Sequence, residues 1–389
     1  MLLGATGFTG RLVAARLAEV APPTLRWALA GRRPAALDAM AQELGGEVGT
    51  LVVDVTVEED LERLARSTRL VVNLVGPFLH RGVAVVGACA RTGTDYCDLA
   101  GELPFIRRSI DAWHEAAVAS GARVVHACGY DCVPSEAGLW AVRETLKERG
   151  LPLPASVTGY IVELKAAMSG GSAASLLDQG ALPADERARA EAPRGLGSGG
   201  AVPGEEEPAG PSWDAARGAW TTPFFPTIIN TRVVRRGIAL SDWPDGFAYR
   251  EAFVGGRGLP GRLKAHGAWL VLRLLSGLTR RAWGRALLRA LLPSPGRGPS
   301  PKAIAAGGFR HEIVPTLPDG SRPLTVVVAC DEDPGYGATR RMLTACALAM
   351  VADGFAAPAG VITPGVAFGP ALGPMLRRAG LTVEVTEGG

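Results

Sequence analysis

Three glycines at the start of the chain could hold a pyrophosphate. Gly4, Gly7 and Gly10 follow a short apolar run at three-residue spacing, and a stretch with helical periodicity continues to Val20. This order predicts a strand, a glycine turn and a helix start, where backbone N–H groups reach an anion at the positive end of the helix. A tight turn in an ordinary α/β domain is the alternative. The turn residues expected to contact a dinucleotide are Gly4, Ala5, Thr6, Gly7, Phe8, Thr9 and Gly10.

Two arginines determine which dinucleotide is expected. The second predicted strand, 25–30, ends in Gly31-Arg32-Arg33. At this point of such a fold an acid selects NAD, whereas arginine accepts the 2′-phosphate of NADP. Because Arg32 and Arg33 stand there without an acid, we predict NADP (NADPH), with a solvated basic turn as the alternative. The other residues expected to line the cofactor follow the third and fourth strands and are Asp54, Val55, Val75, Gly76 and Pro77.

Short apolar runs alternate with helical patterns through the first third of the chain. The further predicted strands are 50–54, 70–75 and 122–127. Strands that alternate with helices form parallel sheets, and a continuous apolar run fits a strand that is buried on both faces. The expected fold class is therefore α/β, with a doubly wound Rossmann NADP-binding domain and a second mixed α/β domain. The first strand has only about three residues, where about five is usual, so we expect the natural chain to begin earlier.

The pattern changes after Pro152. A longer strand is expected at 156–168, while residues 181–211 are rich in Pro, Gly, Ala and Glu and predict a mobile loop outside the core. The expected cofactor domain is 1–135, with the C-terminal segment 334–389 packing back on it. The expected substrate and oligomerisation domain is 136–333.

Four motifs resemble the saccharopine dehydrogenase-like oxidoreductases, and the similarity is greatest to their trans-acting enoyl reductase branch. They are GATGFTG (4–10), VNLVGP (72–77), TDYCDLAGE (94–102) and CGYDCVPS (128–135). Later segments of the same likeness are 168–172, 230–236, 333–337 and 362–365. The resemblance implies an NADPH-dependent reductase of a carrier-bound enoyl thioester in lipid or polyketide synthesis. Lysine-pathway members carry an Asp-His pair where this chain has Ser135-Glu136, which argues against an amino-acid substrate.

Reduction of an enoyl thioester requires a hydride at one alkene carbon, a proton at its neighbour and a donor to the enolate oxygen. Tyr96 and Glu102 follow the strand after Gly76, and Tyr130 and Asp131 follow the next one. Either tyrosine could donate to the enolate oxygen, and either acid could relay a proton. The alternative for the acids is that they cap the following helices. Ser169-Gly-Gly-Ser172 could bind the phosphate of a carrier arm or form a plain capped turn.

Composition narrows the function classes. The 389 residues are 47% hydrophobic and 20% charged with a net charge of +3, which fits a globular protein and gives no reason to expect a nucleic-acid partner. No run is apolar enough to span a bilayer, and no secretory leader is expected. No metal is expected, because Cys128 and Cys132 have no second ligand pair. The cysteines, expected as buried free thiols in a reducing cytosol, are Cys89, Cys97, Cys128, Cys132, Cys330 and Cys346.

The stretch from Glu251 to Glu312 contains no acid between its two ends. Arginines recur at 281, 285 and 289, beside an apolar set at 283, 287 and 291. This pattern fits a helix in a membrane interface, so peripheral membrane contact through 264–293 is one hypothesis. Packing against the domain or a second subunit, and a groove for an acyl chain, are the others.

Two functional alternatives stand beside enoyl reduction. An imine or opine-type dehydrogenase would need basic carboxylate clamps, for which Arg232, Arg235 and Arg236 are the evident cluster. A membrane or lipid-droplet protein that binds NADP without catalysis is the other. The expected partners are a small or carrier-bound acyl substrate and a polyketide synthase or acyl carrier protein, with a homodimer as the assembly. The expected location is the cytoplasm, with peripheral contact to the inner face of the plasma membrane.

Overall fold

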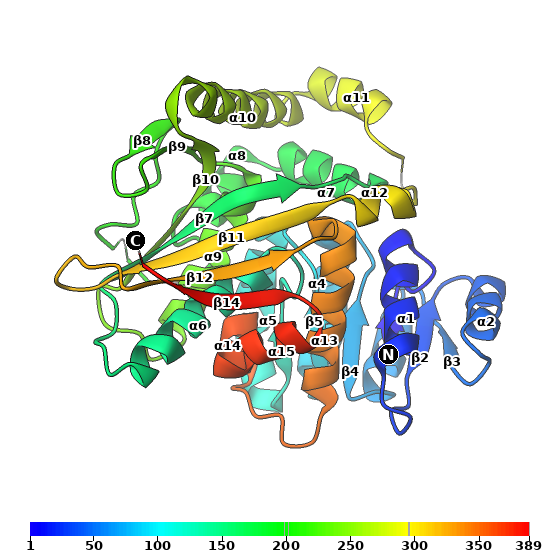
Figure 1. Cartoon of the computed structure of the whole chain (residues 1–389). Coiled ribbons are helices and arrows are strands. Elements are labelled where there is room, and N and C mark those ends of the chain that lie inside the picture. The colour runs from blue at the N-terminus through cyan, green and yellow to red at the C-terminus, as the bar shows by residue number, and fades with distance from the viewer. Residues whose placement is uncertain (198, 201, 295, 389) are drawn as a thin grey trace.

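A computed structural model describes residues 1–197, 199, 200, 202–294 and 296–388 (Figure 1). Two seven-stranded sheets lie side by side in this part of the chain. The first sheet is parallel throughout and has the order β13-β6-β5-β4-β1-β2-β3. Its strands are β1 (Leu2–Leu3), β2 (Ala28–Gly31), β3 (Gly49–Val52), β4 (Leu70–Asn73), β5 (Asp95–Asp98), β6 (Arg123–Val125) and β13 (Gly360–Ile362).

Helices cover both faces of this sheet because its strands are apolar on both. Consecutive strand residues point to opposite sides, so Val72 joins the cluster that includes α1 while Val71 joins the cluster beneath α4. The helices of the first face are α1 (Phe8–Val20), α2 (Pro34–Glu43), α6 (Val133–Glu148), α13 (Thr339–Val351) and α15 (Leu372–Arg378). Those of the second face are α3 (Glu58–Arg66), α4 (Phe78–Thr92) and α5 (Leu103–Ser120). The doubly wound α/β fold is confirmed.

The second sheet is mixed and has the order β14-β12-β11-β7-β10-β9-β8. Only the β7–β10 pair is parallel. Its strands are β7 (Ser156–Lys165), β8 (Ser212–Asp214), β9 (Ala219–Thr222), β10 (Ala248–Gly256), β11 (Gly308–Thr316), β12 (Leu324–Cys330) and β14 (Thr382–Glu387). Helix α6 packs on β11 and β12, and its buried residues belong to the same hydrophobic cluster as residues of the first sheet, so one core joins the two sheets.

The remaining helices and turns pack on the second sheet or against neighbouring helices. They are α7 (Gly170–Ala181), α8 (Ala184–Glu191), α9 (Phe225–Ala239), α10 (Gly258–Thr279), α11 (Ala282–Leu291), α12 (Pro301–Ala305), a π-turn (Pro334–Ala338), α14 (Pro364–Phe368) and a 3₁₀ turn (Gly369–Ala371). Figure 1 shows α10 and α11 end to end as an outer layer, with α7 beneath them. Among the described helices, none combines the length and apolar character needed to cross a bilayer.

Several boundaries differ from those predicted. Residues 181–211 contain α8, and Leu196 is fully buried in the core, so the expectation that this stretch lies outside the core is wrong. A sequence poor in apolar residues can still be ordered where ion pairs hold it, as Arg194 and Glu205 do here. Near the C-terminus, α14 ends at Phe368 because Gly369-Pro370 cannot continue the helix. The segment 334–389 contributes to both sheets, through β13 and β14.

Candidate active site

The glycine turn has the geometry that its sequence requires. Gly4 has a φ of +82°, and a Cβ added there would lie 2.9 Å from the Val75 side chain. A Cβ at Gly10 would lie 2.3 Å from the Gly4 carbonyl oxygen, so α1 packs too closely on β1 for any side chain at that position. These two glycines are therefore dictated by a backbone angle and by a close helix–strand contact. Val75, predicted beside the cofactor, borders this turn.

The turn presents donors with no partner inside the protein. Helix α1 begins at Phe8 after Gly7, with no acid in its first turn. Within the described residues, no acceptor lies within hydrogen-bonding distance of the N–H groups of Thr6, Phe8, Thr9 and Gly10. Unpaired N–H groups at a helix start carry a partial positive charge and bind phosphate. The cradle therefore fits the pyrophosphate of a dinucleotide.

Basic side chains stand where the adenosine phosphate is expected. Arg33 donates from Nη2 to the Thr6 hydroxyl at 3.2 Å, which joins the end of β2 to the glycine turn. The Asp54 carboxylate accepts from the backbone N–H and the hydroxyl of Thr56, and these bonds lower its pKa. Arg32 and Arg81 lower it further, which places both guanidinium groups near Asp54. Arg81 was missed, although its place one turn into the helix after Gly76-Pro77 is visible in the sequence.

The loop after β4 leaves space at the edge of the sheet. Gly76 is exposed, an added Cβ there would meet nothing within 4 Å, and the Gly76–Pro77 peptide is cis. The side chain of Asn73 accepts the Val75 N–H at 3.0 Å and fixes the strand exit. This open edge is the place where a bound nicotinamide ring is expected, at the carboxyl end of the parallel strands.

Glu102 caps a helix. Its two carboxylate oxygens accept the N–H groups of Phe78 and Leu79 at 3.1 and 2.8 Å, at the start of α4. The hydroxyl of Ser175 on α7 donates to the same carboxylate at 2.6 Å. Burial raises the pKa of Glu102, and these hydrogen bonds oppose that effect. The side chain is only 2% exposed, so it fastens α4 to α7 and does not face the open edge.

The two tyrosines named as candidate donors are also held inside the protein. Tyr96 is fully buried, donates to Asp98 at 2.8 Å and accepts from Asn73 at 3.1 Å. Tyr130 is hydrogen bonded through its hydroxyl to His311 Nε2 at 2.9 Å. Burial lowers the pKa of His311 to about 3, so the imidazole stays neutral. Both hydroxyls are therefore engaged with protein groups.

Asp131 differs from the other candidates. Its Oδ1 atom is buried and has no hydrogen-bond partner among the described residues. Its Oδ2 atom lies at the carboxyl end of β5, 3.0 Å from the position of an added Cβ at Gly101, where Ile229 of α9 also approaches. Burial raises the pKa of Asp131 to about 6. A carboxyl group that titrates near neutral pH and has an unpaired oxygen can act as a general acid or base.

A second group of polar residues stands next to Asp131 and was not predicted as part of the site. Glu251 of β10 accepts from the Tyr249 hydroxyl at 2.6 Å and from the Asn230 amide at 2.9 Å. Burial raises the pKa of Glu251 to about 7, to which the charge of Asp131 adds. The Ser135 hydroxyl borders the same carboxyl. The period-2 alternation of β10 places Tyr249 and Glu251 on one face and could have revealed the pair, but their distance in sequence from Asp131 concealed the contact.

The three arginines considered as substrate clamps are occupied by the protein itself. Arg232 pairs with Glu207 and the Glu191 carbonyl, and Arg235 donates to carbonyl oxygens, including that of Tyr249. Arg236 donates to the carbonyl oxygens of Leu196 and Val361. These contacts anchor the stretch before β8 and leave no evident guanidinium for a substrate carboxylate.

The phosphate site expected at Ser169–Ser172 is also filled by protein groups. The Ser169 hydroxyl accepts the Ser172 N–H, the Tyr336 hydroxyl accepts the Ser169 N–H at 2.7 Å, and the Arg297 carbonyl accepts the Gly170 N–H at 2.9 Å. The start of α7 is therefore a capped turn, in agreement with the alternative interpretation.

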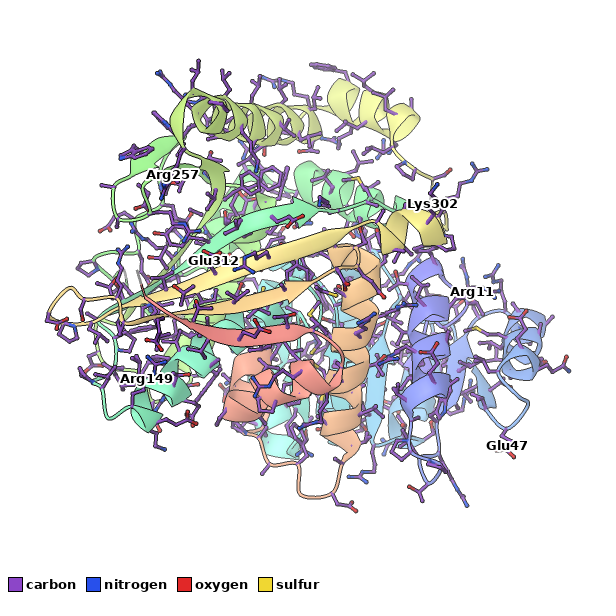
Figure 2. All side chains as sticks on the ribbon, viewed as in Figure 1. Arg11, Glu47, Arg149, Arg257, Lys302 and Glu312 are labelled. Atoms are coloured by element: carbon purple, nitrogen blue, oxygen red, sulfur yellow. The ribbon has the colours of Figure 1, made fainter. Side chains whose placement is uncertain are left out.

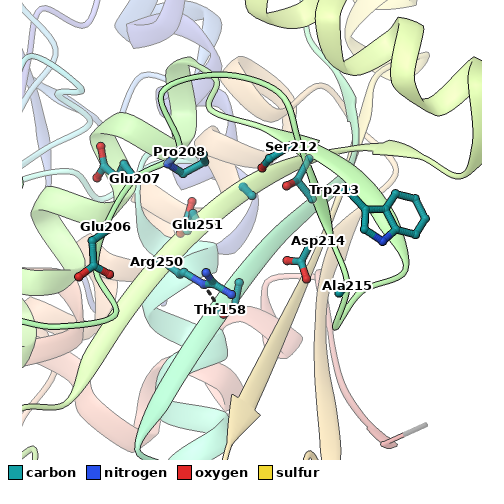
Figure 3. A pocket seen from close by; sticks show the side chains of 12 residues that line it. Thr158, Glu206, Glu207, Pro208, Ser212, Trp213, Asp214, Ala215, Arg250 and Glu251 are labelled. Atoms are coloured by element: carbon teal, nitrogen blue, oxygen red, sulfur yellow. Dashed lines mark hydrogen bonds between the residues drawn. The ribbon is translucent and has the colours of Figure 1, made fainter.

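A cavity of about 340 Å³ lies against β7, β8 and β10 (Figure 3). Figure 3 shows Arg250 hydrogen bonded to Thr158 within it. The four carboxyl-bearing residues that line it are Glu206, Glu207, Asp214 and Glu251. With four carboxyl groups and one guanidinium, the cavity is unsuited to a carboxylate-bearing ligand.

The fold and the phosphate cradle define an NADP-dependent oxidoreductase. Residues 1–125 match the family described as the saccharopine dehydrogenase NADP binding domain. The chain is 36% identical over its whole length to a Mycobacterium tuberculosis protein provisionally named a trans-acting enoyl reductase, covering 97% of it. It is 33% identical over its whole length to the trans-acting enoyl reductase of Mycobacterium ulcerans, again covering 97%. The chain therefore belongs to the saccharopine dehydrogenase-like oxidoreductases, together with these trans-acting enoyl reductases.

Solved structures agree on the fold. The apo saccharopine dehydrogenase of Saccharomyces cerevisiae superposes with a TM-score of 0.56 at 15% identity, with 100% of this chain and 99% of the other covered. The homospermidine synthase of Legionella pneumophila superposes with a TM-score of 0.52 at 11% identity, with 100% and 90% covered. At these identities the likeness concerns the arrangement of the two sheets and not the substrate.

All six cysteines are free and buried, as predicted.

Proposed function

We propose that this oxidoreductase reduces the carbon–carbon double bond of an enoyl thioester in lipid or polyketide biosynthesis. It would act in trans on an acyl chain that an acyl carrier protein or polyketide synthase presents. The observation that carries the proposal is the buried, unpaired Oδ1 atom of Asp131 at the carboxyl edge of the cofactor sheet. The names of the full-length relatives support the same reaction class.

Each step of the proposed reaction can be assigned to the cofactor or to a residue of the site. NADPH, when bound, supplies the hydride for one alkene carbon. The glycine turn and Arg33 hold its phosphate groups, and the open loop at Gly76 leaves room beside β4. Asp131, with a pKa raised to about 6, delivers a proton from Oδ1 to the neighbouring carbon. The charge of Asp131 helps to raise the pKa of Glu251, because two nearby carboxyl groups resist being ionised together.

The two alternatives lose support. An imine or opine-type dehydrogenase needs a clamp for the substrate carboxylate, but Arg232, Arg235 and Arg236 are engaged with the protein and the neighbouring cavity is acidic. A protein that uses NADP only as a structural ligand has no use for an unpaired carboxyl oxygen at the nicotinamide edge, since leaving a buried polar atom unpaired is unfavourable. The unpaired Asp131 oxygen therefore favours catalysis.

The test is NADPH oxidation with 2-enoyl thioesters of N-acetylcysteamine of increasing chain length. We expect turnover by the wild type and a fall in kcat of about a hundredfold or more in Asp131→Asn, since general acid–base groups contribute 10²–10⁴-fold. NADPH binding, followed by fluorescence, should stay unchanged. Glu136→Gln is the matched control, because Glu136 is also a buried acid with a raised pKa but contacts Thr363 and Gly365 on another element.

Two outcomes of this assay would contradict the proposal. If Asp131→Asn reduces enoyl thioesters as fast as the wild type, Asp131 is not the proton donor. If the wild type instead oxidises NADPH only with a 2-oxo acid and an amine, the substrate class is wrong. The homodimer, the carrier protein and the cytoplasmic location expected from the sequence stay predictions.

A further inference from the structure

The outer face of α10 and α11 carries large apolar side chains in water. Of the 16 large hydrophobic residues that are exposed in the described chain, eight lie on these two helices. They are Leu259, Leu263, Leu270, Val271, Leu274, Trp283, Leu287 and Leu291. Four of these, Leu259, Leu263, Trp283 and Leu291, are more than 60% exposed. We call these eight residues the apolar ridge.

In α10 the ridge lies opposite the side by which the helix packs on the protein, and in α11 it lies beside that side. In α10 the buried positions are Gly261, Ala265, Leu272 and Thr279. With 3.6 residues per turn, Leu259, Leu263, Leu270 and Leu274 form a stripe on the far side. In α11, Gly284 and Leu288 are buried while Trp283, Leu287 and Leu291 point out at intervals of one turn. Each helix thus buries one leucine, Leu272 or Leu288, beside small residues and leaves several large apolar residues exposed, which a helix made only to cover a core would not do.

Positive charge surrounds the ridge. Eleven of the 41 Lys and Arg residues lie between Glu251 and Glu312, together with none of the 38 Asp and Glu residues. Figure 2 shows Arg257 at the start of α10, Lys302 on α12 and Glu312 beyond them on β11. Since the whole chain has a net charge of only +3, the rest of the molecule is net acidic. The charge is therefore segregated onto this face.

The cationic side chains lean away from the ridge. The guanidinium of Arg262 lies 5.2 Å from the centre of the Trp220 ring, and that of Arg273 lies 5.5 Å from the centre of Trp269. The ammonium of Lys264 lies 5.1 Å from the centre of the Phe253 ring. These rings belong to the flanks of α10 or to the sheet below it. The apolar side chains therefore project farthest from the protein, and the cations lie closer to its body. Helices that lie at the boundary of lipid headgroups and acyl chains show the same arrangement.

We propose that the apolar ridge docks the protein on the surface of an anionic phospholipid bilayer. A second copy of the chain fits poorly, because a two-fold contact through this face would bring the same cations together. A folded acidic protein satisfies the charge but gives no reason for an apolar stripe that continues over two helices. A bilayer offers negative charge at its surface and an apolar interior below it, and it matches both features.

The docking face is linked to the cofactor site through the chain that leaves α11. The Arg297 carbonyl accepts the Gly170 N–H of α7. Gly298 lies so close to the glycine turn that an added Cβ would be 2.3 Å from the Phe8 ring. A bilayer-bound α10–α11 pair therefore holds the entrance beside the glycine turn at a fixed place near the lipid surface.

Two arginines of the 281, 285 and 289 series are unsuited to a test by mutation. Arg281 and Arg285 donate to the carbonyl oxygens of Gly277 and Thr279, where α10 ends. These two side chains fix the corner between the helices, so removing them would disturb the fold as well as the charge. Arg262, Lys264, Arg273 and Arg289 are exposed and better suited to the experiment.

The experiment is co-sedimentation of the full chain with vesicles of phosphatidylglycerol and phosphatidylcholine, and with phosphatidylcholine alone. The wild type should sediment with the mixed vesicles at low salt and only weakly with phosphatidylcholine or at high salt. The variant R262Q/K264Q/R273Q/R289Q should bind about a hundredfold or more weakly, since each cation near the surface adds about fivefold. The variant L259Q/L263Q/L270Q/L274Q should lose binding while keeping its NADPH affinity.

The matched control is R26Q/R66Q/K147Q/R378Q, which removes four exposed cations elsewhere on the molecule and should bind like the wild type. Equal binding by the control and the ridge variants would overturn the proposal, as would a wild type that ignores anionic vesicles at low salt. If the leucine variant changes the oligomeric state in light scattering without changing vesicle binding, the ridge is a contact between copies. If the wild type ignores vesicles but binds an acidic carrier protein through these leucines, the partner is a protein.

Discussion

Glu136 offers a quantitative test of how the core treats buried charge. Glu136 is 2% exposed, and its carboxylate accepts from the Thr363 hydroxyl at 2.6 Å and the Gly365 N–H at 2.7 Å, with no ion pair to a cation in the described part of the chain. Burial raises its pKa from 4.5 to about 7. A carboxyl group with a raised pKa in the folded state contributes stability that is fully present below the unfolded value and is lost as the pH rises through the folded value.

The size of the effect follows from the shift. A difference of about 2.5 pKa units corresponds to about 3 kcal/mol of unfolding free energy lost between about pH 4.5 and 8. Glutamine preserves the shape, and its amide can accept from Gly365 while donating to Thr363. We therefore expect Glu136→Gln to be more stable than the wild type at pH 8.5 by up to about 3 kcal/mol, and similar to it at pH 5. For a chain of this length the gain in Tm is about 4 °C.

The assay is thermal unfolding followed by circular dichroism from pH 5 to 9 for both proteins. Glu251 and Asp131 also have raised pKa values, so both curves should fall as the pH rises. The difference between the curves isolates Glu136. If the two proteins lose stability in parallel over this range, Glu136 ionises at its ordinary pKa inside the protein, and the reasoning from burial is refuted.

Three further predictions concern the cofactor and the cap of α4. Arg32→Ala/Arg33→Ala should lower the preference for NADPH over NADH at least about tenfold in fluorescence titration, because a charge-assisted phosphate contact contributes about 1.5–3 kcal/mol; equal wild-type affinity for both dinucleotides would contradict this. Gly10→Ala should abolish NADPH binding in the same titration, since its Cβ would lie 2.3 Å from a carbonyl oxygen, and unchanged affinity would show that α1 can move away. Glu102→Gln should destabilise the protein by about 2 kcal/mol in urea unfolding, because one helix-start N–H of α4 then faces another donor; an unchanged midpoint would mean that water replaces the lost acceptor.

Local features of the sequence predicted the cofactor half of the site well. The spacing of Gly4, Gly7 and Gly10 encodes a turn whose shape depends on adjacent residues only, and the structure reproduces it. Arg33 was assigned from its place after a strand, and it contacts Thr6 as that place requires. Sequence patterns of this kind predict the structure well because the strand, turn and helix are contiguous in the chain.

The proposed catalytic residues were harder to predict from the sequence, because their role depends on which polar atoms the fold leaves without a hydrogen-bond partner. Tyr96 lies inside β5 and not after it, so its side chain points into the core beneath α4, and no sequence rule locates a strand end that closely. Glu102 was proposed either as a relay or as a cap, and only the contact with Phe78 and Leu79 separates the two roles. Glu251 was missed because β10 pairs with β7 over a long separation in sequence.

The number of paired carboxylate oxygens separates the proposed catalytic acid, Asp131, from the other buried acids. Glu102, Glu136 and Glu251 are all buried acids with raised pKa values, and in each of them both carboxylate oxygens have a donor within the protein. A carboxylate with both oxygens paired is held in place and has no free site for a substrate. Asp131 is half-buried as a residue, but its Oδ1 atom is buried and has no partner among the described residues, at the edge of the cofactor sheet. Since an unpaired buried oxygen is costly unless something binds there, this atom is where a substrate should complete the site.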